Sequence, residues 1–161
     1  MPTNNAIGDN GEAIFCGRIT QDFIFKVYFL GEKAPIVDFM LEILDSGNHS
    51  YFCLVQVKST TRGYQVGGNL KASITEDDLN KLIERPLPTY VAGVDIINEA
   101  VYLCPAFDSK VKYPSIPVTH KLTLLNKVAS KLELLKLKED IMNYWDNSGS
   151  DSYKTNYKSL L

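Results

Sequence analysis

Two polar motifs interrupt apolar stretches in the first part of this 161-residue chain. The first is Asp38, at the end of Pro35-Ile36-Val37-Asp38, and the second is Gln56-Val57-Lys58. A charged side chain inside an apolar strand is costly to bury unless it has a partner, a metal ion or water. Because a short turn separates the two stretches, the sequence predicts that both motifs lie on adjacent strands and form one site.

A carboxylate beside a lysine is suited to phosphodiester hydrolysis. A Mg²⁺ ion bound by Asp38 and several waters would activate water and stabilise the charge that develops on phosphorus. Gln56 and Lys58 point to the same face of their strand because side chains alternate. Lys58 is therefore placed to orient the attacking water, and the carbonyl oxygen of Val57 can supply a further metal ligand.

Apolar periodicity predicts the elements that position these motifs. Residues 9–28 have apolar side chains at roughly helical spacing, which predicts a helix. Residues 36–44 and 51–58 are expected to form antiparallel strands joined at Ser46-Gly47-Asn48, which has the composition of a hairpin turn. Residues 69–74 could add a third strand.

The second half begins with a helix start signal at Thr75, where three acids follow the N-cap residue. This helix is expected to end at Pro86, because proline removes a backbone donor and clashes with the preceding turn. Residues 89–97 form a nearly continuous apolar run, which indicates a central strand buried on both faces. Residues 100–104 are expected to return as its neighbour.

A final helix is predicted over residues 121–145, followed by a polar end. The complete order is helix, strand, strand, strand, helix, strand, strand, helix, which predicts an α/β sandwich on a mixed central sheet flanked by helices. Residues 1–145 would form a single domain, and residues 146–161 a flexible tail. The final helix is expected to bury a stripe formed by Leu125, Val128, Leu132, Leu135, Met142 and Trp145.

The order of elements and motifs resembles the PD-(D/E)xK nuclease superfamily, whose restriction-endonuclease-like core runs α-β-β-β-α-β. In that family an Asp closes the second core strand and the (D/E)xK motif lies in the third. Pro35-Ile36-Val37-Asp38 resembles the first half-motif and Gln56-Val57-Lys58 the second. Glu12, in the first helix after Gly8 and Gly11, matches the helical acid that many members direct at the metal. The pattern is similar in particular to a QxK-bearing subgroup of small bacterial domains found alone or fused to defence proteins.

The resemblance implies an endonuclease that hydrolyses DNA with Mg²⁺ or Mn²⁺, in defence or DNA repair. Asp38, Glu12, Gln56 and the Val57 carbonyl would bind the metal, and Lys58 would orient water. A homodimer and a partner protein from a defence system are further implied possibilities. Gln56 replaces the usual acid with an uncharged amide, so the alternative is a catalytically silent module that binds nucleic acid or a protein. The choice between DNA and RNA stays open.

Two further regions could contact nucleic acid. Arg62, Tyr64, Gln65 and Lys71 lie in or beside a glycine-rich loop and could contact DNA, with a plain flexible loop as an equal alternative. The segment from Lys110 to Lys138 holds seven lysines and one acid, in a chain whose net charge is −2. Such a segment can bind phosphate, but a solvated helix face is the more common explanation.

Composition places the chain in a broad class. No apolar run approaches the ~20 residues that a transmembrane helix needs, and the polar N-terminus lacks the apolar core of a secretory signal. Cys16, Cys53 and Cys104 are far apart and form no CxxC pair, so we expect buried thiols rather than disulfides or a zinc site. These features predict a cytoplasmic protein without membrane association.

Overall fold

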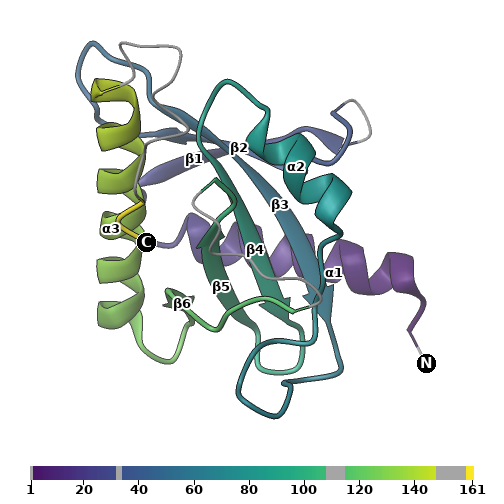
Figure 1. Ribbon diagram of the computed structural model, residues 1–161. Helices are drawn as coiled ribbons and strands as arrows, with labels where there is room; N and C mark the ends of the chain where they lie inside the picture. Colours follow the sequence, from purple (N-terminus) through teal and green to yellow (C-terminus); the bar gives the residue numbers. More distant parts are fainter. Residues whose placement is uncertain (1, 32–33, 108–114, 148–158) are drawn as a thin grey trace.

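The chain forms a mixed α/β structure around one six-stranded sheet (Figure 1). This computed structural model describes residues 2–31, 34–107, 115–147 and 159–161. Its elements in chain order are α1 (Asn4–Ile19), β1 (Phe25–Phe29), β2 (Phe39–Ile43), β3 (Phe52–Thr60), α2 (Glu76–Ile83), β4 (Thr89–Asp95), β5 (Ala100–Pro105), β6 (Lys121–Leu122) and α3 (Lys127–Asp146). No helix among the described residues is long and apolar enough to cross a membrane.

The strands lie in the sheet in the order of the sequence, from β1 to β6. Neighbours are antiparallel except β3 and β4, which are parallel, with Leu54 opposite Thr89. A parallel pair needs a crossover, and α2 lies in that connection. The predicted mixed sheet flanked by helices is confirmed, as is the antiparallel pairing of β2 with β3.

Helices cover both faces of the sheet. On one face, α1 and α3 pack against residues such as Phe39, Val55 and Leu103 to form the larger core. On the other face, α2 and the segment around Leu70 pack against residues such as Val91. Every residue of β4 is buried, as its apolar run predicts. Cys53 and Cys104 are buried as expected, and Cys16 is partly buried.

The predicted helix over residues 9–28 is wrong in its second half. The helix starts earlier, with Thr3 as its N-cap, and ends at Ile19; Phe25–Phe29 is strand β1. Phe23 has a positive φ of 55° in the turn between them. The apolar residues that suggested a continuous helix fit a strand equally well, because residues 25, 27 and 29 also alternate.

Residues 69–74 form no strand, which corrects the second expectation. Leu70 makes isolated bridges to Tyr64 and Ile116, and the segment crosses the sheet instead of joining it. Gly93 in β4 allows this approach, because a Cβ there would lie 3.0 Å from Leu70 Cδ2 and 2.9 Å from Ile116 Cγ2. The elements still follow the order α-β-β-β-α-β, because β1, which was not predicted from the sequence, brings the number of strands before α2 to three.

The last helix begins at Lys127 rather than residue 121, and Lys121–Leu122 is the short strand β6. The predicted buried stripe is wrong at four of its six positions, whereas Met142 and Trp145 are partly buried and pack against the core as expected. Leu125, Val128, Leu132 and Leu135 are exposed, while the helix buries Ser130, Leu134, Leu137, Asp140, Ile141 and Tyr144. Both faces carry apolar residues at helical spacing, so periodicity alone could not select the inner one.

The predicted tail, residues 146–161, is described only at its two ends. Residues 148–158 lie outside the described residues. Residues 159–161 return to the body of the protein, where the Leu160 N–H donates to Asp140 Oδ1 at 2.8 Å. The end of the chain thus packs against α3.

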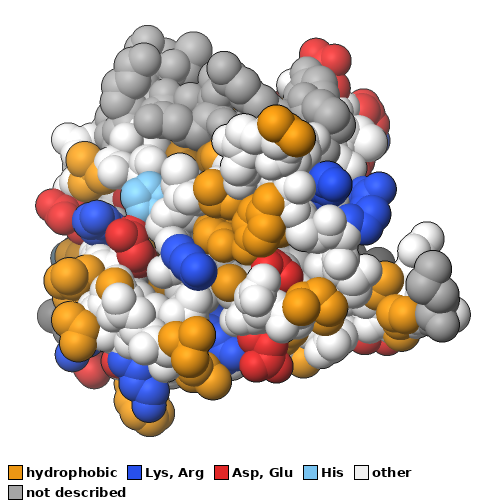
Figure 2. All heavy atoms as spheres, turned by 90° about the horizontal axis from the view of Figure 1, so that it is seen from below, with side chains coloured by type: hydrophobic (Ala, Val, Ile, Leu, Met, Phe, Trp, Pro, Cys, Tyr) orange, Lys and Arg blue, Asp and Glu red, His pale blue; other side chains and the backbone are white. Residues whose placement is uncertain are grey.

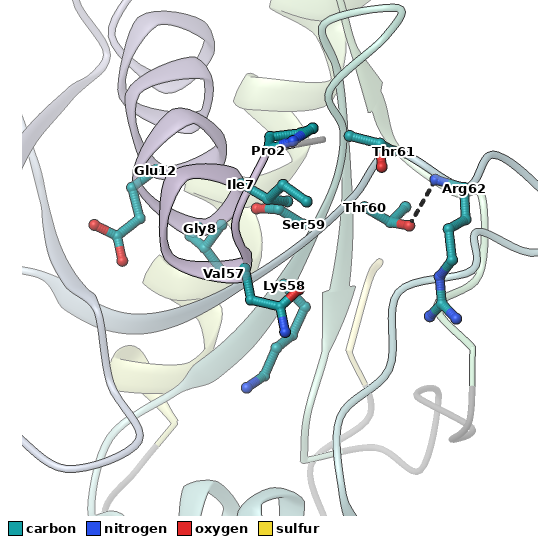
Figure 3. Close-up of a pocket in the computed structure, with 11 residues that line it drawn as sticks. Pro2, Ile7, Gly8, Glu12, Val57, Lys58, Ser59, Thr60, Thr61 and Arg62 are labelled. Carbon is teal, nitrogen blue, oxygen red and sulfur yellow. Dashed lines mark hydrogen bonds between the residues drawn. The ribbon is translucent and has the colours of Figure 1, made fainter.

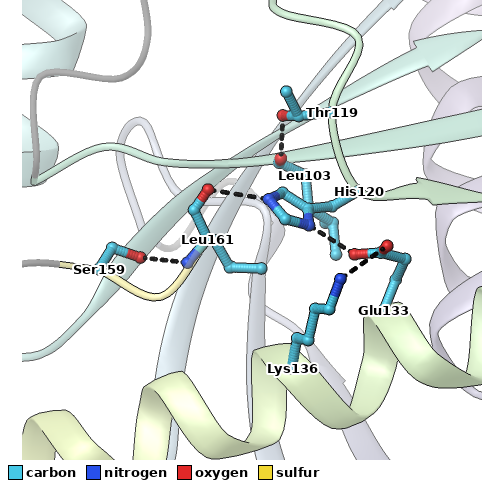
Figure 4. Close-up of polar contacts among 7 residues, drawn as sticks. All are labelled: Leu103, Thr119, His120, Glu133, Lys136, Ser159 and Leu161. Carbon is cyan, nitrogen blue, oxygen red and sulfur yellow. Dashed lines mark hydrogen bonds and ion pairs between the residues drawn. The ribbon is translucent and has the colours of Figure 1, made fainter.

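A polar cluster at this contact is drawn in Figure 4. His120 Nδ1 lies 2.5 Å from Glu133 Oε2, and its Nε2 lies 2.8 Å from the carbonyl oxygen of Leu161. Lys136 Nζ lies 3.3 Å from the other Glu133 oxygen. Burial raises the pKa of Glu133, but the contacts with His120 and Lys136 outweigh it and hold that pKa below its ordinary value. The cluster joins β6, α3 and the chain end.

The close packing of α1 on β3 depends on one glycine, which gives a first prediction. A Cβ on Gly11 would lie 1.6 Å from Ser59 Oγ and 2.5 Å from Ser59 Cβ. Gly11→Ala should therefore lower the free energy of unfolding, because overpacking of about 1–3 kcal/mol exceeds the helix-propensity gain of about 1 kcal/mol. Urea unfolding measures this change.

Gly17→Ala is the matched control in the same helix, because nothing lies within 4 Å of its Cβ position. It should stabilise the protein by up to about 1 kcal/mol. Equal stabilisation by both substitutions would contradict the close approach of α1 to Ser59.

Candidate functional site

Asp38 lies where the pairing of β2 with β3 ends. The antiparallel register closes with Phe39 opposite Val55. One step beyond it, the Val57 N–H donates to Asp38 Oδ2 at 2.6 Å. The Asp38 carboxylate therefore takes the place of a backbone acceptor that a longer β2 would have supplied. The Val57 N–H is satisfied although β2 does not extend far enough to pair with it.

The carbonyl oxygen of Val57 points to the same edge of β3, where β2 no longer pairs with it. Within a strand, the N–H and C=O of one residue point to the same edge. The Asp38 N–H donates to Val55 O on this edge, while the Leu54 N–H donates to Pro88 O on the opposite one. Val57 has the parity of Val55, so its carbonyl oxygen points into the space beyond β2, next to the Asp38 carboxylate.

Lys58 lies close enough to act on Asp38. Burial is the largest effect and raises the pKa of Asp38, while the hydrogen bond from Val57 and the charge of Lys58 lower it in part. The net pKa is raised. The sequence prediction that Asp38 and Lys58 come together thus agrees with the electrostatics of the structure.

Glu12 reaches the same region from α1. Its pKa is raised, first by burial and then by the negative charges of Asp38 and Asp9. The close approach at Gly11 brings this part of the helix against Ser59. In Figure 3, Glu12 extends from α1 and Lys58 from β3, with the backbone of Val57 between them. Asp38, just before the start of β2, therefore influences Glu12 and is itself influenced by Lys58.

An open cleft of about 660 Å³ runs beside these groups (Figure 3). The start of α1 forms one wall and the end of β3 the other. Three hydroxyl residues and then Arg62 follow Lys58 along the chain, a feature that the Ser-Thr-Thr-Arg sequence could have indicated. The lining residues are Pro2, Asn4, Ile7, Gly8, Glu12, Val57, Lys58, Ser59, Thr60, Thr61 and Arg62.

Gln56 does not line the cleft and is nearly buried, with 5% of its surface exposed. Its Oε1 has no hydrogen-bond partner among the described residues. An unpaired buried amide oxygen costs free energy, and a cation can satisfy it. With the Asp38 and Glu12 carboxylates and the Val57 carbonyl, these oxygens are of the type that Mg²⁺ prefers. The described residues hold no cluster of three or more His, Cys, Asp or Glu that could bind a metal.

The backbone before Asp38 is strained, which the sequence did not indicate. Ile36 has a φ of 73°, a region that β-branched residues rarely occupy. Arg85, just after α2, donates from Nη2 to the carbonyl oxygen of Pro35 at 3.2 Å and helps to hold this turn. Strain of this kind persists where the surroundings fix a residue, and here it sets the entry of Asp38 into β2.

The four residues proposed as loop contacts to DNA lie in different settings. Arg62 lines the cleft and donates to the carbonyl oxygen of Lys71 at 3.1 Å. The Tyr64 hydroxyl turns inward, 2.7 Å from both Asp95 Oδ2 and Tyr102 Oη. The N–H of Gln65 donates a hydrogen bond to the carbonyl oxygen of Asn69 within the loop. Arg62 is thus the member of this set that shares the cleft with Lys58.

Comparison of the chain with protein-family models, with curated proteins and with solved structures found no match. The site is therefore interpreted from its own geometry and from the motif order.

The raised pKa values give a prediction about stability. A carboxyl whose folded pKa lies above its unfolded value of about 4 stabilises the fold at lower pH, and this contribution is lost as pH rises through the folded pKa. Asp38→Asn should therefore be more stable than the wild type at neutral pH, and this advantage should shrink toward about pH 3.5, below the unfolded pKa. Urea unfolding with a chelator present measures both conditions.

Glu12→Gln should change stability in the same direction, because its pKa is also raised. Asp77→Asn is the control, since Asp77 is exposed and its oxygen lies 2.6 Å from Lys81 Nζ. That control should gain no stability at neutral pH. An Asp38→Asn protein that loses stability as pH rises from acidic to neutral, relative to wild type, would contradict the unfavourable burial of the Asp38 charge.

Proposed function

We propose that this protein is an endonuclease that hydrolyses phosphodiester bonds of DNA with a divalent cation, Mg²⁺ or Mn²⁺. The observation that carries the proposal is the hydrogen bond from Val57 to Asp38, which sets the carboxylate beside Lys58. Glu12 adds a second carboxylate whose pKa responds to Asp38. Glu12 and Lys58 line the open cleft, and Asp38 is bonded to Val57, which also lines it, so that two acids and a lysine form a set suited to phosphoryl chemistry.

The topology supports a restriction-endonuclease-like core. The elements α1, β1, β2, β3, α2 and β4 follow the α-β-β-β-α-β order of the PD-(D/E)xK superfamily. Asp38 immediately precedes β2, and Gln56-Val57-Lys58 lies within β3. Gln56-Val57-Lys58 therefore lies in the third strand, where that family carries its second half-motif, whereas Asp38 stands just before the second strand instead of closing it.

The residues fit a divalent cation by the type of their oxygens. Asp38, Glu12, the Val57 carbonyl and the unpaired Gln56 Oε1 would hold the ion. When bound, such an ion supplies positive charge to the reacting phosphate and lowers the pKa of a bound water. The ion would also offset the burial that raises the pKa values of both acids, and the negative charge of Asp38 that further raises the pKa of Glu12.

The other groups of the cleft would act on the nucleic acid. Lys58 would stabilise the charge that develops on the phosphate and orient the attacking water. Arg62 and the hydroxyls of Thr60 and Thr61 line the same cleft and would position the phosphate backbone. A role in defence or DNA repair, in a homodimer or with a defence partner, follows from the family resemblance as part of this proposal.

Plasmid cleavage with Mg²⁺ or Mn²⁺ tests the assignment. Asp38→Ala and Lys58→Ala should each reduce the cleavage rate by at least about 100-fold, because each removes charge aimed at the reacting phosphate. Lys26→Ala is the control, since Lys26 is an exposed lysine of β1 that lies opposite Glu42, away from Asp38. It should cleave at the wild-type rate. Cleavage that survives both site substitutions would exclude this site, and cleavage of RNA alone would reassign the substrate.

A second function is favoured by one observation, the amide at position 56. Gln56 leaves the site with fewer negative charges than a paired-acid motif has. The affinity for a metal ion falls when its ligands carry less negative charge. In this alternative the chain keeps the fold and the cleft but binds nucleic acid or a protein without cleaving it.

Calorimetric titration with Mn²⁺ separates the two functions. The nuclease proposal expects binding to the wild type, at least about tenfold weaker binding to Asp38→Ala, and tighter binding to Gln56→Glu, because the added carboxylate supplies charge. Asp77→Ala is the control and should bind as the wild type does. Absence of Mn²⁺ binding in the wild type favours the silent module and contradicts a metal-dependent nuclease.

A further inference from the structure

Helix α3 carries apolar side chains on two opposite faces. Its inner face packs into the core through residues such as Leu134, Leu137 and Ile141. Its outer stripe is exposed: Leu125 is 97% exposed, Val128 76%, Leu132 56% and Leu135 40%. A helix on the surface of a globular protein normally presents polar residues outward, so a continuous apolar outer face indicates a binding surface.

The spacing of the outer stripe is regular. Leu125, Val128, Leu132 and Leu135 follow one another at intervals of three, four and three residues. This alternation keeps side chains on one face of a helix and forms the seam through which two helices pack. The last three lie on α3 itself, while Leu125 immediately precedes its N-cap residue Asn126. The stripe is therefore shaped to receive another helix along its length.

The borders of the outer stripe are basic. Lys131 precedes Leu132, and Lys138 lies two helical turns further along the same border, while Lys136 follows Leu135 on the other border. Lys136 contacts Glu133 at 3.3 Å, so part of its charge is already compensated. On the left of Figure 2, where α3 lies, hydrophobic, Lys or Arg, and Asp or Glu side chains share the surface. Two other lysines of the basic segment, at positions 110 and 112, lie outside the described residues.

These charges argue against a second copy of this chain as the occupant. In a parallel pair, Lys131 of one helix would face Lys136 of the other across the seam, and in an antiparallel pair Lys131 would face Lys138. Like charges at these border positions disfavour pairing and direct the choice of partner. The basic border instead complements a helix that carries acids beside its apolar residues.

We propose that the outer stripe of α3 is the docking surface for an amphipathic helical segment of another protein. The segment would place apolar side chains against Leu125, Val128, Leu132 and Leu135, and Asp or Glu side chains beside Lys131 and Lys138. This inference does not depend on the proposed nuclease activity, because none of these residues lines the cleft.

Two synthetic helical peptides and the full chain test the proposal. One labelled peptide has Leu at alternating intervals of three and four residues with Glu at the border positions, and its counterpart has Lys in place of Glu. Fluorescence anisotropy measures the affinity of each for the protein. The acidic peptide should bind at least about tenfold more tightly than the basic one, and added salt should reduce the difference.

Substitutions locate the binding surface. Leu132→Asp should weaken binding of the acidic peptide at least about tenfold, because it places a charge in the apolar seam. Ile97→Asp is the matched control, since Ile97 is 70% exposed and lies in the turn after β4. It should leave the affinity unchanged. Lys131→Glu combined with Lys138→Glu should reverse the preference, so that the basic peptide binds more tightly. Circular dichroism confirms that each variant is folded.

Three results would overturn the proposal. The first is equal affinity for the two peptides, and the second is unchanged binding by Leu132→Asp. The third is sedimentation of the wild type as a dimer that Leu132→Asp dissociates, because a second copy would then cover the outer stripe. Plasmid cleavage by Leu132→Asp at the wild-type rate would keep this surface distinct from the nuclease proposal, whose failure would appear only in the Asp38 and Lys58 variants.

Discussion

The hydrogen bond from the Val57 N–H to Asp38 Oδ2 connects the fold to the candidate site. It lies where β2 stops pairing with β3, so it both completes the backbone hydrogen bonding and holds a carboxylate at the edge of the sheet. The strained turn at Ile36, held by Arg85, delivers Asp38 to this position. The close packing at Gly11 brings Glu12 toward it from the other side. The left-handed backbone at Ile36 and the glycine inside helix α1 both depart from local structural preferences, as is typical near functional sites.

The sequence predicted the fold best where one interpretation of the pattern was possible. The nearly continuous apolar run of β4 and the N-cap of α2 at Thr75 left no competing element, and both are present. Prediction failed where two periodicities coincide. Phe23 and Val27 fit a helix that continues from Ile19, but Val27 fits a strand as well, and only the sheet partner β2 decides between them. That decision depends on long-range pairing, which a local pattern does not contain.

The candidate site was predictable in its composition but not in its details. Asp38 and Lys58 could be brought together from strand order alone, because neighbouring strands place their residues side by side. The hydrogen bond between Asp38 and the Val57 backbone could not be predicted, since it depends on where β2 begins. In α3, two apolar faces at helical spacing offered two possible cores, and the sequence could not show which one meets the sheet. Shape and pairing, rather than residue type, determine these features.

The positive charge near the candidate site does not fully compensate the negative charges of its partly buried acids. Asp38 and Glu12 both have raised pKa values, and the charge of Lys58 lowers the pKa of Asp38 only in part. A protein selected for stability alone would be expected to replace such acids, because their burial is unfavourable at neutral pH. The unpaired oxygen of Gln56 adds to the same imbalance. The divalent cation that we propose for this site would offset these costs, whereas independent structural roles for the acids would leave them in place.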